Sequence, residues 1–315
     1  MSINYLNPLS NAFSRMKTAL FKPFDIKKWF VLGFTAFLAG LTDWPHGGGD
    51  NSPRGHGRLS DFDIWDILEF PAIAWEWLVD HPGWFMLITF GIVFITGMII
   101  LLNWLSSRGK FMFLDNVIHN KAEVVKPWKD FKSLGNSLFF WRLLFGIVSF
   151  LLIAGILVLG FIAMLIANDG YFPRHPSLGP ILGFVLFFIS VIFVVVFVSM
   201  LLENFVIPIM YRNNVKVLKA WGIFLPLLSR KLIHFILYGI LLFILYIFII
   251  IGVIIVGLFT CCIGFLLLII PYIGSVIMLP VSYTFRSFSL EFLEQFGPDF
   301  TIFPKEEVTA VDTAE

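Results

Sequence analysis

The stretch that decides the fold runs from Phe235 to Phe285 and reads FILYGILLFILYIFIIIGVIIVGLFTCCIGFLLLIIPYIGSVIMLPVSYTF, 51 residues without a charged side chain. A helix crosses the apolar core of a bilayer with about 20 residues, each adding about 1.5 Å. The stretch is therefore too long for one crossing and suits two, joined by a tight turn near residues 257–264. It predicts an integral membrane protein of the all-α class.

The composition of the whole chain agrees with this prediction. Of its 315 residues, 58% are hydrophobic and only 14% are charged, whereas soluble domains carry roughly 25% charged residues. So little charge cannot solvate the surface of a soluble enzyme or of a disordered chain, and it cannot coat a nucleic-acid backbone. We therefore expect no nucleic-acid partner.

Other uncharged runs predict further spans. Residues 83–107, 143–168 and 176–202 are each long enough for one crossing, whereas 29–42 has only 14 residues and would also fit a re-entrant or interfacial helix. Counting that short run as a crossing, we expect a polytopic bundle of six transmembrane helices, at about 29–42, 83–105, 143–167, 181–202, 233–258 and 262–284.

The distribution of charge favours the six-span arrangement. With six spans, 19 of the 22 lysines and arginines fall on one side, and only Arg54, Arg58 and Arg174 fall on the other. The positive-inside rule then places both termini in the cytoplasm. The chain divides into a cytoplasmic amphipathic segment 1–28, a membrane domain 29–285 with an outer loop 43–82, and a cytoplasmic tail 286–315.

The chain also carries signs of internal repetition. A shift of 93 positions relates Val124, Lys126, Trp128, Phe131, Leu134 and Gly146 to Val217, Lys219, Trp221, Phe224, Leu227 and Gly239. A shift of 179 relates 111–116 to 290–295, and Lys22-Pro23-Phe24 is a weaker echo of Lys126-Pro127-Trp128. This pattern predicts three helical hairpins, each entered from a basic amphipathic segment; the alternative is chance similarity among apolar windows.

Those basic segments favour the surface of an anionic membrane. In residues 10–22, Phe13, Met16, Leu20 and Phe21 form one helical stripe beside basic residues, and 111–137 and 204–230 follow the same scheme. Any single lysine among them can also be an ordinary anchor whose stem lies along apolar surface. In the outer loop, 44–58 has the composition of a linker, and 61–80 predicts a surface helix bent at Pro71.

A search for catalytic or metal-binding patterns finds none with suitable spacing. His46, Asp50 and His56 lie in a glycine-rich loop without rigid spacing, and the adjacent Cys261 and Cys262 suit packing better than a disulfide or a metal site. No expected span has an ionisable residue at its centre, which argues against an intramembrane protease and against a proton-coupled carrier. We therefore expect no catalytic residue, no metal and no cofactor.

Polar residues gather instead at the cytoplasmic ends of the expected spans. They are Arg108, Lys110, Asp115, Asn116, Arg142, Glu203, Arg212 and His234. Such a layer can bind a lipid phosphate or the headgroup of a cargo, or it can hold the hairpins together through paired charges, which we favour. The 93-residue shift makes Lys110 and Glu203 equivalent, so these two can pair.

The sixth expected span is interrupted by Gly264, Pro271, Gly274 and Pro280. Broken helices line pathways in some membrane proteins and occur in ordinary bundles as well. On the first interpretation, Pro271, Tyr272 and Ser275 are the pathway candidates.

The N-terminal Lys22-Pro23-Phe24, the six spans and the repeated Lys-x-Trp-x-x-Phe segments carry a resemblance. The chain resembles uncharacterised bacterial multi-pass membrane protein families similar to the membrane domain attached to some glycerophosphodiester phosphodiesterases. The catalytic His-Arg-Gly motif of those enzymes has no counterpart here. The resemblance implies a helical bundle in the bacterial inner membrane and no activity to carry over.

We expect a non-catalytic membrane protein that works as a lipid-associated organiser or accessory subunit, with anionic headgroups on the cytoplasmic side as its partners. A second copy of the chain or another membrane protein is a further partner to consider. The competing function is a facilitator or channel for a small or amphiphilic solute. An intramembrane enzyme is the third candidate.

Overall fold

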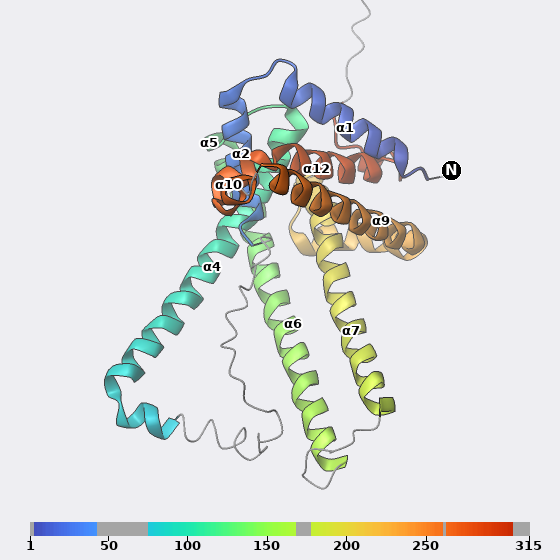
Figure 1. Ribbon diagram of the computed structural model, residues 1–315. Coiled ribbons are helices and arrows are strands. Elements are labelled where there is room, and N and C mark those ends of the chain that lie inside the picture. The colour runs from blue at the N-terminus through green and yellow to red at the C-terminus, as the bar shows by residue number, and fades with distance from the viewer. Residues whose placement is uncertain (1–2, 43–74, 168–177, 261–262, 305–315) are drawn as a thin grey trace, which may run out of the picture. The chain divides into compact units, whose positions relative to one another are not determined.

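The structure is a computed structural model that describes residues 3–42, 75–167, 178–260 and 263–304. Within these ranges every regular element is a helix (Figure 1), so the predicted all-α class is confirmed for the described residues. They fall into two compact units. Unit 1 comprises Met1–Asp43, Asn103–Arg142 and Val196–Glu315, and unit 2 comprises Trp44–Leu102 and Leu143–Val195.

Four helical stretches among the described residues are long and apolar enough to cross a membrane. They are Pro82–His119, Lys132–Met164, Gly179–Asn213 and Val217–Phe259. Hardly any residue in their most apolar parts is buried within the protein. Exposed apolar surface on this scale is stable only against lipid or another apolar partner, so these helices indicate a membrane protein.

Unit 2 contains apolar helical segments with little polar surface. They come from α4 (Pro82–His119), α6 (Lys132–Ala167) and α7 (Leu178–Leu201). Gly160 of α6 faces the ring of Phe184 of α7 so closely that no larger side chain fits there.

Unit 1 contains the core of the molecule. The helix α1 (Leu6–Phe21) lies along α12 (Leu279–Glu294), and α2 (Ile26–Gly40) packs against α11 (Pro271–Ile277) (Figure 1). At the centre, the ring of Phe205 contacts four other aromatic rings at centroid distances of 4.9 to 6.0 Å: Phe224, Phe235, Tyr238 and Phe292. Aromatic side chains from three elements therefore form one continuous cluster.

The helix α7 continues through a π-helical turn, η2 (Leu202–Val206), into α8 (Ile207–Asn213). The residue after this turn begins α8, and Pro208 follows it. A proline has no backbone N–H to donate, and its ring crowds the carbonyl four residues earlier in an α-helix. The carbonyl four residues before Pro208 belongs to Asn204, which lies in the wider π-helical turn. Glu203 lies in the same turn.

The helix α9 (Val217–Phe259) contains a sharp break. Lys231 has φ −130° and ψ 27°, outside the helical region. Aromatic side chains before and after this residue pack against each other, so the chain turns back on itself there. The longer part after the break begins close to residue 233, where the sequence predicts the start of the fifth span.

The first and sixth expected spans are short or broken in the structure. The helix α2 has 15 residues, about 22 Å in length, whereas the apolar core of a bilayer is about 30 Å thick. The region of the sixth span forms α10 (Ile263–Ile269), α11 and α12 in place of one helix, because Pro271 and Pro280 each begin a new helix. The described part of the chain thus has four long apolar helices.

One prediction about the amphipathic segments is wrong in part. Residues 111–118 were expected at the membrane interface, but nearly all of them are buried in unit 1, and so is most of 201–210. Residues 286–294, expected in the cytoplasmic tail, belong to α12, where Phe288, Leu290 and Phe292 are fully buried. Residues 111–118 and 201–210 carry large apolar residues on nearly all sides, which suits a protein core better than an interface.

Several predictions fall outside the described residues. They concern the linker 44–58, most of the outer surface helix 61–80, the metal candidates His46, Asp50 and His56, and the cysteines Cys261 and Cys262. Only the end of that surface helix is described, and residues 75–80 are helical.

Candidate functional site

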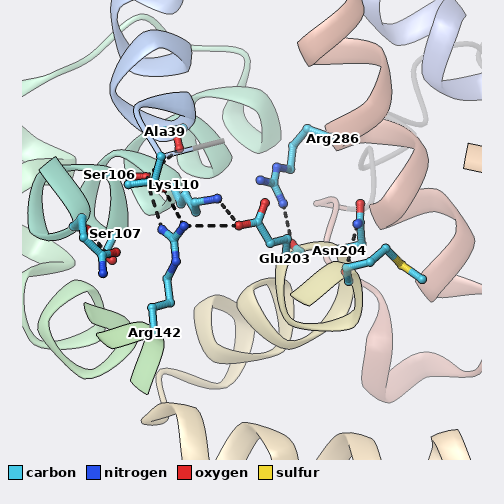
Figure 2. A network of polar contacts seen from close by, with 11 residues as sticks. Ala39, Ser106, Ser107, Lys110, Arg142, Glu203, Asn204 and Arg286 are labelled. Carbon is cyan, nitrogen blue, oxygen red and sulfur yellow. Dashed lines mark hydrogen bonds and ion pairs between the residues drawn. The ribbon is translucent and has the colours of Figure 1, made fainter. Parts of the chain in front are cut away.

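A network of buried and partly buried polar groups in unit 1 is centred on Glu203, whose side chain is 27% exposed (Figure 2). Its carboxylate forms an ion pair with Lys110 of α4, whose side chain is only 1% exposed, and lies 3.8 Å from the guanidinium of Arg142 of α6. Its backbone carbonyl accepts a hydrogen bond of 2.8 Å from Arg286 of α12. One residue of η2 thus connects three other helices, and the expected pair between Lys110 and Glu203 is present.

Arg142 extends the network toward α2. It donates hydrogen bonds to Thr42 Oγ1 at 2.6 Å and to Ser106 Oγ at 3.3 Å. The Ser106 hydroxyl in turn donates to the carbonyl of Ala39 at 2.8 Å. Buried charges that are paired and hydrogen-bonded in this way fix the relative positions of helices, so the geometry of this network suits a structural role.

Arg108 lies apart from the Glu203 network, between two tryptophan rings. Its guanidinium carbon is 4.3 Å from the centre of the Trp104 ring and 4.9 Å from that of Trp128. It also donates to Asn136 Oδ1 at 3.0 Å. A guanidinium between two indole faces is held by cation–π attraction, which anchors α5 (Val125–Asp130) to α4.

Asp115 belongs to a third group of polar side chains. Its carboxylate accepts a hydrogen bond of 2.5 Å from the hydroxyl of Tyr211 and lies 3.1 Å from Nδ1 of His119. Tyr211, His119 and Arg212 line a pocket of about 320 Å³ together with Ile118, Phe131, Ile302 and Pro304. The structure therefore brings Asp115 and Arg212 to the same place, away from the Glu203 network.

The remaining two members of the predicted polar layer have local partners. Asn116 is fully buried and exchanges two hydrogen bonds with the backbone of Glu123, which holds the loop after α4. Nδ1 of His234 lies 2.8 Å from the hydroxyl of Tyr5. Burial raises the pKa of the Tyr5 phenol, so this hydroxyl stays protonated at neutral pH. The eight residues thus form separate groups and no single ring.

The predicted pathway residues lie where α11 meets α2. Tyr272 donates to the carbonyl of Phe30 at 3.0 Å, and its ring packs beside those of Phe30 and Phe34. Ser275 donates to the carbonyl of Pro271 in its own helix at 3.0 Å. The hydroxyl groups of Tyr272 and Ser275 therefore each donate a hydrogen bond within the protein. Helix packing is sufficient to explain both residues.

Sequence reasoning missed several residues of these sites. Tyr211 and His119 were overlooked, although His119 follows Asp115 by one helical turn, a spacing at which side chains meet. Asn136 could not be predicted from the sequence, because its hydrogen bond with Arg108 depends on how α6 packs against α4. Among the described residues, no cluster of three or more His, Cys, Asp or Glu side chains is arranged to hold a metal ion.

Comparison with known proteins places the chain in a family. No curated protein matches the sequence, and no solved structure matches it. Residues 4–279, most of the chain, match a family of unknown function (DUF7544). The chain therefore belongs to this family.

Proposed function

We propose that this protein is a non-catalytic protein of the bacterial inner membrane that acts as a lipid-associated organiser or accessory subunit. On this proposal the basic surface of unit 1 lies against anionic headgroups at the cytoplasmic side. The surface consists of the exposed faces of α5, the start of α6 and the start of α9.

The observation that carries the proposal is an exposed apolar residue followed by an exposed lysine at two corresponding places. Val125 is 67% exposed and precedes Lys126, and Leu218 is 74% exposed and precedes Lys219. Lys129, Lys132 and Lys216 are exposed near them. An apolar side chain beside a lysine suits the boundary between headgroups and acyl chains, where each nearby lysine contributes about 1 kcal/mol of attraction to anionic lipid.

The helix α1 supports the proposal from the N-terminal side. It buries Met16 and Leu20, while Phe13 and Phe21 are exposed on the same helix as the exposed Lys17. Part of the predicted stripe therefore packs within the protein, and part is left for an interface. Exposed phenylalanines beside a lysine are typical of helices that lie in a membrane surface.

The hairpin repeat is part of the proposal. Asn120 follows α4 and has φ 53°, and Asn214 follows α8 and has φ 49°. An asparagine with a left-handed backbone conformation just after the last helical residue is a common way for a helix to end. The two asparagines are 94 positions apart. The ring pairs Phe111–Phe131 and Phe205–Phe224 are both stacked, which supports a repeated unit with one residue inserted at η2 and one residue fewer in the loop after Asn214 than in the loop after Asn120.

The orientation in the membrane is proposed on the same grounds. We propose six crossings, of which α2 and the α10–α11 region are short, with both termini in the cytoplasm. The four long apolar helices and the separation of 19 from 3 basic residues support this arrangement.

Native mass spectrometry of the detergent-extracted chain tests the lipid role. The test variant replaces Lys126, Lys129 and Lys132 by glutamine. The matched control replaces Arg54, Arg58 and Arg174 by glutamine, which removes the same charge from the side expected outside. We expect the lysine variant to retain less anionic lipid than the wild type and the arginine variant to retain as much.

Two results would count against the lipid role. One is an equal loss of anionic lipid in both variants, which would make the effect one of net charge alone. The other is an unchanged lipid profile in the lysine variant together with solute flux in proteoliposomes that changes when Tyr272→Phe or Ser275→Ala is introduced. That second result would favour the channel.

A further inference from the structure

The pocket beside Asp115 is unlike the other polar groups of unit 1, because two of its basic side chains keep nitrogen atoms without a partner among the described residues. Among the described residues, neither the guanidinium of Arg212 nor Nε2 of His119 has a hydrogen-bond partner, and Arg212 is exposed. In the Glu203 network, by contrast, the cations point at a carboxylate or at hydroxyls.

The position of His119 is fixed by its neighbours. Nδ1 lies 3.1 Å from the Asp115 carboxylate and 3.2 Å from the backbone carbonyl of the same residue. These two contacts orient the ring with Nδ1 toward Asp115. Nε2, on the opposite edge of the ring, is then the nitrogen left for a ligand.

The acidic residue at this site lies behind the wall of the pocket. Asp115 is not among the lining residues, and one of its oxygens already accepts the hydroxyl of Tyr211 at 2.5 Å and faces His119. The described residues that line the pocket include no carboxylate. Its charged wall is therefore cationic.

The rest of the wall is apolar. Ile118, Phe131, Ile302 and Pro304 face the cavity. A volume of about 320 Å³ lies at the lower end of the range for small-molecule sites. This is more space than a bare phosphate ion fills, so the ligand has room for an apolar substituent against Phe131 and Ile302.

We propose that this pocket binds a phosphate monoester that carries an apolar group, with Arg212 and His119 holding the phosphate. The planar guanidinium of arginine matches two phosphate oxygens at once, and Nε2 of His119 is placed for a further hydrogen bond to the phosphate. The ligand can be a soluble phosphate ester or the headgroup of a lipid of the phosphatidic acid type. The inference stands on the pocket and does not require the lysine surface, because none of the five lysines of that surface lines the cavity.

There is a structural alternative for the two cations. His119 lies in the last turn of α4 and Arg212 in the last turn of α8, where a positive charge offsets the partial negative charge of the helix end. If this is their whole role, they stabilise the helix ends and the pocket binds no anion with saturation. The two accounts therefore differ in a measurable way.

Equilibrium dialysis of the full chain in detergent with phenyl phosphate provides the first test. We expect saturable binding by the wild type and an affinity lower by about tenfold or more in Arg212→Gln and in His119→Gln, because each loses a charge-assisted hydrogen bond. Arg230→Gln is the matched control, since it removes an exposed cation of unit 1 that lies outside both the pocket and the lysine surface. Unchanged thermal unfolding midpoints show that the variants are folded.

A second arm uses vesicles that contain phosphatidic acid and identifies the source of the phosphate. Binding of phenyl phosphate that depends on Arg212 supports a soluble ester. Arg212-dependent enrichment of phosphatidic acid alone supports a lipid headgroup. The proposal is overturned if the wild type binds neither probe with saturation, or if Arg212→Gln and His119→Gln bind as tightly as Arg230→Gln.

Discussion

The rings of Phe224 and Phe235 lie edge to face with their centroids 5.1 Å apart, although eleven residues separate them in one helix, α9. In a straight helix eleven residues rise about 16 Å, which is too far for ring contact. The reversal at Lys231 therefore divides α9 into an arm of unit 1 that carries exposed lysines and a longer apolar helix.

Spin labels on the two parts of α9 measure this reversal. With Cys261 and Cys262 replaced by serine, labels at Leu218 and Phe243, both exposed, would be about 37 Å apart along a straight helix. We expect a distance well below that value by double electron–electron resonance. Labels at Phe243 and Ile254, both beyond the break, are the control at about 16 Å, and a 218–243 distance near 37 Å would show that α9 is straight.

The pair formed by Lys110 and Glu203 is expected to contribute more to stability than a surface pair. Lys110→Met and Glu203→Gln should each lower the free energy of unfolding in mixed micelles, since each leaves a charge in a buried setting. The double variant should lose less than the sum, by about 1 to 3 kcal/mol. The pair of Arg15 and Glu291, 2.5 Å apart with the arginine side chain 45% exposed, is the control, with an expected coupling of about 1 kcal/mol or less because solvent screens the arginine. Equal coupling in both pairs would contradict the role given to the Glu203 network.

The close approach of α4 to α2 depends on Gly109. A Cβ atom added there would lie 2.6 Å from backbone atoms of Leu38 and Ala39, which cannot move aside as a side chain can. Gly109→Ala should therefore lower the thermal unfolding midpoint despite a gain of about 1 kcal/mol in helix propensity. In Gly97→Ala, in the same helix, the added atom meets nothing within 4 Å, so its midpoint should stay the same or rise. A stable Gly109→Ala variant would disprove the contact.

The orientation of the chain is accessible to thiol labelling of intact cells. In the background without Cys261 and Cys262, cysteines at Asp50 and His175 should react with an impermeant reagent added outside, and cysteines at Lys132 and Lys219 should react only after the membrane is opened. This follows from the excess of basic residues on one side. Labelling of Lys132→Cys from outside would reverse the proposed topology.

Hydropathy and charge were sufficient for part of the fold. The apolar runs predicted the all-α class and the long helices, because a helix that faces lipid must be apolar over its whole length. The 93-residue shift pointed to Lys110 and Glu203 as partners, and they do pair. The start of the fifth span was also close to the break at Lys231.

The rest depended on contacts between distant segments. The sequence predicted residues 111–118 at the membrane interface. A single sequence does not show that α1 and α12 pack against this segment in unit 1 and bury its apolar side chains. The pocket at Asp115 needed Tyr211 from α8 and Ile302 from the C-terminal segment, about 90 and 190 positions away. Neither local spacing nor composition carries that information.

Photo-crosslinking tests most directly the central claim that the lysine surface of unit 1 contacts anionic lipid. A photoreactive amino acid is placed at Val125, at Leu218 and, as an internal reference, at Phe94, an exposed apolar residue of unit 2. Lipid adducts formed in native membranes are then identified by mass spectrometry. We predict a larger anionic fraction among the adducts at positions 125 and 218 than at position 94, and a loss of this excess when Lys126 and Lys219 are replaced by glutamine. Equal anionic fractions at all three positions would contradict the account.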